Sequence, residues 1–321
     1  MIQRKLQIAI GIVLVILALS GCGGPSVALP TSTSVPPTNT SIPPTITPVP
    51  PTPTATPRPS FDVLLTDRSG AQTKVTSLKV HVHDSCKGFI YYVSVPTETD
   101  FDWEFIRFFT GEYEVDIPFE IIQKVEVKVG DFLDDKRDSI MLADGTVIQG
   151  KEIMEAWGDI DTMLTGETDL GTLQIAFEDI SEMTPLYEPK STYIASADGT
   201  ERAILSLQDG TELKLENAAF YRQARNENGC YVGNQIYETS MMFETTGGSI
   251  YDLTWEKIDS ISFRDDLSYT DEFDLITPSG STYSGKAKNI VGFEGTVAFG
   301  SYTLTVRVRF HTVAKSLIFG R

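Results

Sequence analysis

The chain has 321 residues, a formal charge of −18 and 41% hydrophobic residues. This hydrophobic content suits a packed core, and the length is enough for one large or two ordinary domains. The negative charge argues against binding to nucleic acid or to an anionic membrane surface, because both require a basic footprint. The composition therefore predicts a globular part that has no nucleic-acid partner.

The first 21 residues have the organisation of a secretory signal peptide. Two basic side chains near the start precede an uncharged apolar run over residues 8–19. As a helix this run would rise about 18 Å, which is short of the roughly 30 Å hydrocarbon core of a bilayer. The run ends in the sequence LSGC at 19–22, which resembles the lipobox of bacterial lipoproteins.

That resemblance implies cleavage before Cys22, attachment of a lipid such as palmitate to its thiol, and acylation of the new amino terminus. Several acyl chains would anchor the mature protein stably, since each buried methylene contributes about 0.8 kcal/mol. We therefore expect anchoring to the cell membrane or envelope, with the globular part outside the cytoplasm. The alternative is an ordinary membrane-spanning anchor in which Cys22 is incidental.

Residues 22–60 form a proline- and threonine-rich segment. It contains 12 of the 17 prolines, and residues 31–51 are three seven-residue repeats, TSTSVPP, TNTSIPP and TITPVPP. Such a composition cannot form a core or a strand ladder, so it predicts an extended, polyproline-like stalk of about 3.1 Å per residue. The composition is similar to that of stalks in surface lipoproteins of filamentous green non-sulfur bacteria. Its expected role is to space the globular part from the bilayer.

Residues 61–321 have the pattern of an all-β protein. Apolar residues alternate, Thr, Val, Ile and aromatic residues are frequent, and Asp-Gly pairs at 144, 198 and 209 are typical of hairpin turns. One pattern recurs four times, with alternating apolar residues, an aromatic, and further apolar residues three and usually six positions later. Its aromatic residues are Phe119, Phe177, Trp255 and Phe310.

Alternate copies of this pattern match best, at separations of 136 and 133 residues, so the order is A-B-A-B. The B copies share a Gly-Lys pair at 150 and 285, the A copies share a cysteine, and each A-to-B junction is acidic. We therefore divide the globular part into four β units, which are A1 (61–128), B1 (129–185), A2 (186–263) and B2 (264–321).

Each copy predicts a strand, one 3₁₀-like turn and a short closing strand. This ending is similar to that of small five-stranded Sm-like barrels. The expected fold is a tandem duplication of barrel-like units in two pseudo-symmetric halves, in which each unit closes or pairs its own edges. A single large sandwich is the main alternative.

Three groups of residues are candidates for a specific role. Cys86 and Cys230 occupy equivalent positions in the A copies, and export would allow a disulfide between them, with two separate buried thiols as the alternative. His81 and His83 lie two apart on a predicted strand and could face one metal ion, but two ligands do not make a site. Phe101, Trp103 and Phe105 alternate with acids, which fits a half-buried strand or a sugar-binding face.

No recognisable catalytic motif is present. The chain lacks a Gly-x-Ser-x-Gly elbow, an HExxH motif and paired CxxC motifs, and the acidic junctions lack the spacing of a calcium loop. We therefore expect a non-catalytic, surface-exposed binding or interaction module without a cofactor, whose extracellular or envelope partner the sequence does not identify. An extracellular hydrolase of polysaccharide or peptide and a structural envelope protein are the alternatives.

Overall fold

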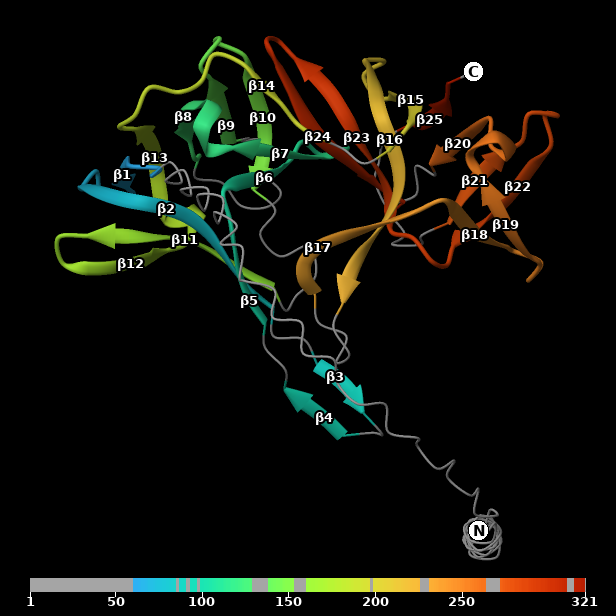
Figure 1. Cartoon of the computed structure of the whole chain (residues 1–321), viewed down its shortest axis with the longest axis horizontal. Coiled ribbons are helices and arrows are strands. Elements are labelled where there is room, and N and C mark those ends of the chain that lie inside the picture. Colours follow the sequence, from blue (N-terminus) through green and yellow to red (C-terminus); the bar gives the residue numbers. More distant parts are fainter. Residues whose placement is uncertain are drawn as a thin grey trace, which may run out of the picture. The chain divides into compact units, whose positions relative to one another are not determined.

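The computed structural model describes most of the globular part (Figure 1). Contacts divide the chain into two units, residues 1–56 and 57–321, and every described residue lies in the second. The described ranges are 60–84, 87–90, 93–96, 99–128, 138–152, 160–196, 199–225, 231–263, 272–310 and 315–320. Cys22, Cys86 and Cys230 lie outside them.

The regular elements in these ranges are strands and three short 3₁₀-helices. The prediction of an all-β protein is therefore confirmed. The described strands pair antiparallel, apart from the parallel pair of β14 (Tyr193–Ile194) with β24 (Tyr302–Arg309). Among the described residues, no helix has the length and apolar character needed to cross a membrane.

The strands of the first half pair in two groups of five, which can be followed in Figure 1. Group 1 has the order β13-β1-β2-β11-β12, and group 2 has the order β8-β9-β10-β6-β7. The strands of group 1 are β1 (Val63–Asp67), β2 (Gln72–Asp84), β11 (Ile160–Thr168), β12 (Gly171–Ile175) and β13 (Ile180–Pro185). Those of group 2 are β6 (Phe105–Phe109), β7 (Glu114–Pro118), β8 (Ile122–Glu126), β9 (Asp138–Leu142) and β10 (Val147–Glu152).

The second half has the same pairing pattern. Group 3 has the order β25-β15-β16-β23-β24, and group 4 has the order β20-β21-β22-β18-β19. The strands of group 3 are β15 (Glu201–Ser206), β16 (Glu212–Arg225), β23 (Gly292–Phe299), β24 and β25 (Ser316–Phe319). Those of group 4 are β18 (Ser240–Thr245), β19 (Ile250–Thr254), β20 (Ser260–Phe263), β21 (Glu272–Ile276) and β22 (Thr282–Ala287).

Two of the remaining strands extend these groups, and two others form a separate two-stranded sheet. β5 (Thr99–Trp103) pairs with β2, β17 (Tyr231–Glu238) pairs with β16, and β3 (Lys87–Ile90) forms a hairpin with β4 (Val93–Pro96). Within each half two closing strands pair, β8 with β13 and β20 with β25. Apart from the β3–β4 hairpin, the described strands of each half are therefore connected by pairing.

The expectation that each unit pairs its own strands is wrong. β1 and β2 precede residue 128, but they pair with β13 and β11, which follow it. β15 and β16 likewise pair with β25 and β23 across residue 263. Alternating side chains identify a strand and its buried face, but they do not specify which edges pair.

The predicted order of a strand, a 3₁₀ turn and a closing strand is confirmed in three of the four copies. The turns are η1 (Phe119–Ile121), η2 (Phe177–Asp179) and η3 (Trp255–Lys257). In each, the aromatic carbonyl accepts a hydrogen bond from the amide three residues later, at Ile122, Ile180 and Ile258. The turn predicted for the fourth copy, at 311–314, lies outside the described residues.

Glycines shared by the B copies mark where two strands approach closely. A Cβ at Gly150 would overlap the carbonyl oxygen of Phe109, and one at Gly285 would overlap that of Glu244. These contacts lie between β10 and β6 in group 2 and between β22 and β18 in group 4. Only glycine fits both places without a backbone shift.

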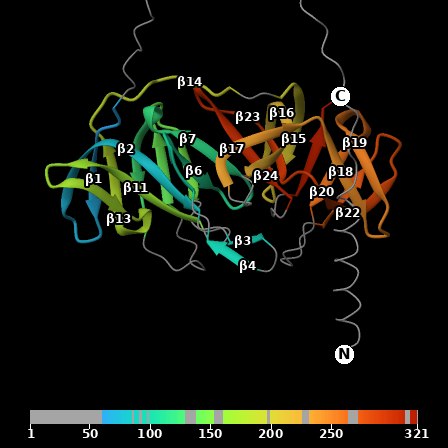
Figure 2. The ribbon, with the colours of Figure 1, turned by 60° about the horizontal axis from the view of Figure 1, so that its bottom comes forward.

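The two halves meet through an edge-to-edge strand pair. β7 of group 2 pairs antiparallel with β24 of group 3, with Val115 opposite Val306 and Glu114 opposite Arg307 (Figures 1 and 2). Val115 and Val306 are fully buried. The strands β10, β6, β7, β24, β23, β16 and β17 therefore form one continuous sheet that crosses the junction.

Candidate functional site

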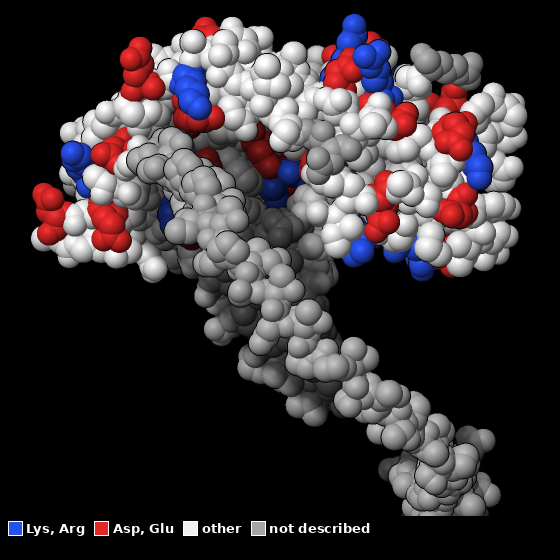
Figure 3. Space-filling view, in the orientation of Figure 1, with Lys and Arg blue, Asp and Glu red and all other residues white. Residues whose placement is uncertain are grey.

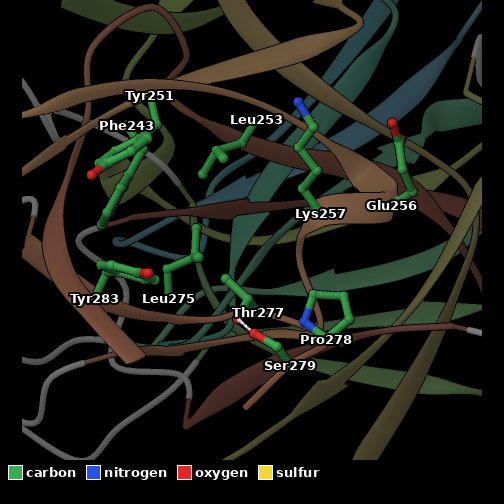
Figure 4. A pocket seen from close by; sticks show the side chains of 10 residues that line it. All are labelled: Phe243, Tyr251, Leu253, Glu256, Lys257, Leu275, Thr277, Pro278, Ser279 and Tyr283. Carbon is green, nitrogen blue, oxygen red and sulfur yellow. Dashed lines mark hydrogen bonds between the residues drawn. The ribbon is translucent and has the colours of Figure 1, made fainter. Parts of the chain in front are cut away.

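A half-open pocket of about 450 Å³ lies in group 4 (Figure 4). Strands β18, β19, β21 and β22, the turn η3 and the β21–β22 turn contribute its walls. Its lining residues are Phe243, Tyr251, Leu253, Glu256, Lys257, Leu275, Thr277, Pro278, Ser279 and Tyr283.

The strand register explains why these aromatic and aliphatic residues converge. Tyr251 lies opposite Phe243, and Tyr283 lies opposite Leu275, so each pair faces one side of the sheet. Phe243 and Leu275 are buried, whereas the two tyrosines are 46% and 42% exposed. Their ring centroids are 6.1 Å apart. The pocket thus has an apolar floor and two phenol rings at its opening.

Polar groups occupy another part of the pocket wall. In Figure 4, Lys257 and Glu256 lie away from the two tyrosines, and Thr277 and Ser279 are hydrogen-bonded. The Glu256 carboxylate accepts a hydrogen bond of 2.5 Å from Thr254 Oγ1, which lowers the pKa of Glu256. Glu256 is therefore ionised at neutral pH. An apolar floor with a few polar groups at the rim is typical of a binding site.

A second candidate is a cluster of buried charges at the junction of the halves. Three acids and three arginines project from one face of the continuous sheet, and all are at least 91% buried. They are Arg107 on β6, Glu114 and Asp116 on β7, Glu294 on β23, and Arg307 and Arg309 on β24. Figure 3 shows acidic and basic side chains within a recess near the centre of the same unit.

Ion pairs within this cluster link the two halves. Asp116 accepts two hydrogen bonds from Arg107, at 2.8 and 3.1 Å, and one of 2.5 Å from Arg307. Arg307 Nε lies 2.5 Å from a Glu294 carboxylate oxygen, and Arg309 pairs with Glu114. Tyr237 donates a 2.5 Å hydrogen bond to Glu294.

Burial and the neighbouring positive charges shift the pKa of Asp116 in opposite directions. Desolvation opposes its ionisation, but the neighbouring guanidinium groups of Arg107 and Arg307 outweigh this effect and hold the pKa of Asp116 below its ordinary value. Burial raises the pKa of Tyr221, whose hydroxyl has no hydrogen-bond partner in the described part of the chain. The cluster is charge-balanced and closed, which suits a structural junction better than a catalytic site.

Two of the aromatic candidates, Trp103 and Phe105, are partly buried. Trp103 and Phe105 stack with their ring centroids 5.1 Å apart, and the Arg107 guanidinium carbon lies 4.5 Å from the Trp103 ring centroid. β5 ends at Trp103 and β6 begins at Phe105, so the two residues belong to different strands. The side chain of Phe101 lies outside the described residues.

The histidine candidates lie on β2, where His81 Nδ1 is 3.1 Å from an Asp102 oxygen. Asp102 also pairs with Lys79 at 3.0 Å, so the acid already has two partners. In the part of the chain that the structure describes, no group of three or more His, Cys, Asp or Glu side chains forms a metal-binding cluster. Cys86 and Cys230 fall outside that part.

The sequence did not identify the pocket or the buried charges. Tyr251 occupies a position in the repeated pattern where the other copies have Val115, Leu173 and Val306. A tyrosine in place of an aliphatic residue was the available signal for an exposed position. Comparisons of the chain with family models, with curated proteins and with solved structures found no match in any of the three.

Proposed function

We propose that the protein is a non-catalytic interaction module, carried outside the cytoplasm on a stalk that the lipidated Cys22 anchors to the membrane. Its binding site is the pocket of group 4 together with the adjoining strand β19. The observation that carries this proposal is the pair of exposed tyrosines, Tyr251 and Tyr283, above a floor of Phe243 and Leu275. The partner inserts an apolar side chain between the tyrosines.

The pocket has the features that such contacts require. Tyrosine contributes a large, rigid contact area with few rotatable bonds, and its hydroxyl remains hydrated at the rim. Ile250, the first residue of β19, is 56% exposed beside the pocket. Neighbouring exposed apolar side chains favour a protein surface as the partner over a small polar molecule.

Eight of the described acids have a lowered pKa, which does not suit them to act as general acids in hydrolysis. General acids in glycosidases and related hydrolases need a raised pKa, which burial away from positive charge produces. In the described residues, each carboxyl group with a resolved shift has a lowered pKa, including Glu256 in the pocket. These acids are therefore suited to ion pairs rather than proton donation.

We further propose that the chain arose by duplication of small β units that resemble Sm-like barrels. Several corresponding positions support this origin. Ser77 and Asn217, at the bends of the long strands β2 and β16, are the two described non-glycine residues with a positive φ, 55° and 53°. Gly150 and Gly285 occupy matching close approaches. The pairing order of five strands also recurs in each group.

The binding site can be tested by photo-crosslinking in living cells. The photoreactive residue p-benzoylphenylalanine replaces Tyr283 in the full chain, and the matched control replaces Val147, an exposed residue at the start of β10. We expect discrete adducts from position 283 and none from position 147. Absence of adducts at 283, or equal labelling at both positions, would contradict the proposal. Hydrolysis of polysaccharides or peptides by the purified chain would favour the enzymatic alternative.

A further inference from the structure

The junction between the two halves pairs two strands, β7 and β24, and each of these strands has a counterpart elsewhere in the chain. β7 and β19 correspond, because each leads into a 3₁₀ turn that begins with an aromatic residue, Phe119 or Trp255. β12 and β24 correspond in the same way, since they precede Phe177 and Phe310. β7 pairs with β24 inside the chain, and this leaves one β12 edge and one β19 edge.

Both remaining edges are exposed. In the described residues, β12 pairs only with β11, and β19 pairs only with β18. In β7 four of five side chains are buried, whereas every side chain of β12 and β19 is exposed or only partly buried. Figure 1 shows the two strands on opposite sides of the second unit. The unit thus has two exposed strand edges, and their counterparts, β7 and β24, pair with each other inside the chain.

Neither edge carries a lysine, a proline or a bulge. Proteins blunt exposed edges with lysine, proline or bulges. β12 has the sequence GTLQI and β19 the sequence IYDLT, which contain neither lysine nor proline and only one charge, Asp252. Exposed apolar side chains cluster near these edges, with Met163 on β11 and Met242 on β18. Leu170, at the β11–β12 turn, is fully exposed.

We infer that the protein assembles head to tail, with β12 of one copy pairing antiparallel to β19 of the next as β24 pairs with β7 within the chain. This inference rests on the proposed function and identifies the partner as a second copy of the same chain. The contact is heterologous, because two different surfaces meet, and it therefore produces a ring or a filament rather than a closed dimer.

The internal junction fixes the register of this contact. Val306 lies opposite Val115, so the corresponding residues Leu173 and Tyr251 face each other between copies. Arg307 and Asp116 form an ion pair internally, and their counterparts are Gln174 and Asp252. The Gln174 amide donates a hydrogen bond to the Asp252 carboxylate. Ile250 occupies the position of Glu114, so this contact is more apolar than the internal one.

The internal junction also includes a contact between two turns, and the counterpart of one of these turns lines the pocket. Inside the chain, the β23–β24 turn touches the β9–β10 turn through a 2.8 Å hydrogen bond from Ser301 N to Asp144. Between copies the β11–β12 turn, with Leu170, extends toward the β21–β22 turn, although its hairpin is two residues shorter, because β12 begins six residues before Phe177 and β24 begins eight before Phe310. Pro278 and Ser279 of the β21–β22 turn line the pocket.

Cysteine crosslinking tests the register directly. Directly opposed residues of antiparallel strands have Cβ atoms about 4.5–5.5 Å apart, within reach of a disulfide after small shifts. Full chains carrying Leu173→Cys and Tyr251→Cys, with tags of different size, are mixed and oxidised. We expect a crosslinked species that contains both tags, and none above the unsubstituted chain from either variant alone. The matched control, Leu173→Cys with Asp252→Cys, places the second thiol on the opposite face of β19 and should crosslink poorly.

Charge variants provide an independent measurement by sedimentation of the full chain. Gln174→Glu places a like charge beside Asp252 and should weaken association several-fold, whereas Gln174→Arg restores an opposite charge and should strengthen it. A chain that stays monomeric at all concentrations and yields no mixed crosslink overturns the inference. If Tyr283 then still labels a different protein, the proposed function stands; if it labels nothing, both fail.

Discussion

The β7–β24 junction and the edges β12 and β19 have corresponding backbones but different side chains. At the junction, Glu114, Asp116, Arg307 and Arg309 are buried as ion pairs. The corresponding positions on the exposed edges hold Ile250, Asp252, Gln174 and Ala176, so only Asp116 has a charged counterpart there. Strands of corresponding position are therefore paired at the β7–β24 junction and have an exposed edge at β12 and β19.

The difference shows how buried ion pairs can keep the β7–β24 junction paired throughout the folded state. A buried ionic set is satisfied in one register only, and separating the strands would leave its members unpaired in a poorly solvated place. An apolar edge with one amide and one carboxylate tolerates both exposure and pairing. We therefore expect the junction to be part of the folded state and the open edges to depend on protein concentration.

Removing the shared acid of the junction should have the largest effect on stability. Asp116→Ala leaves Arg107 and Arg307 without their common partner, and breaking a buried pair in this way costs about 3–5 kcal/mol. The matched control is Asp252→Ala at the corresponding position of β19, where we expect a change of less than about 0.5 kcal/mol. Denaturant unfolding of the full chain, followed by tryptophan fluorescence, measures both. Equal effects would contradict the distinction between the junction and the open edge.

The pH dependence sharpens this comparison. The pKa of Asp116 is lower in the folded state than in the unfolded state, so its stabilisation is complete above the unfolded value of about 4 and is lost as the pH falls through the folded value. The stability advantage of the wild type over Asp116→Asn should therefore shrink below about pH 4. An advantage that is independent of pH from 7 to 2 would show that ionisation of Asp116 is not its source.

The glycines at the close strand approaches should show an intermediate effect in both halves. In Gly150→Ala and Gly285→Ala the new methyl group overlaps a backbone carbonyl oxygen, and relief of such a clash costs about 1–3 kcal/mol. Gly247→Ala is the control, because the nearest atom to its Cβ, Thr245 Oγ1, is 3.8 Å away. Thermal unfolding compares the three variants. Stability of Gly150→Ala equal to that of Gly247→Ala would mean that β10 and β6 are less tightly apposed.

The local part of the fold was predictable from sequence. Alternating residues such as Val115 and Ile117, followed by Phe119, define a strand and its buried face, and the next two apolar steps define the turn. The partner of each strand was not predictable. β1 pairs with β13, more than a hundred residues away, and the alternation within each strand is compatible with many partners.

The buried charge cluster could not be predicted for a related reason, because its burial depends on strands that are distant in the sequence. Glu114 and Asp116 alternate with apolar residues, which is typical of a half-exposed strand, but β24 and the arginines on it bury the polar face as well. The alternation of Phe101, Trp103 and Phe105 predicted one strand, whereas the chain bends at Glu104, between β5 and β6. Both outcomes depend on contacts between distant segments, which a local pattern does not contain.

The bends of the two long strands provide the smallest predicted effect and a comparison between halves. Ser77 and Asn217 adopt left-handed backbone angles, which cost a non-glycine residue about 1–2 kcal/mol, and asparagine tolerates them better than serine. Glycine removes this strain but increases the entropy of the unfolded chain, so Ser77→Gly should raise stability by up to about 1 kcal/mol. Asn217→Gly should change it less. Denaturation midpoints measure both, and a loss of stability in Ser77→Gly would mean that its side chain, rather than its backbone, holds the bend in β2.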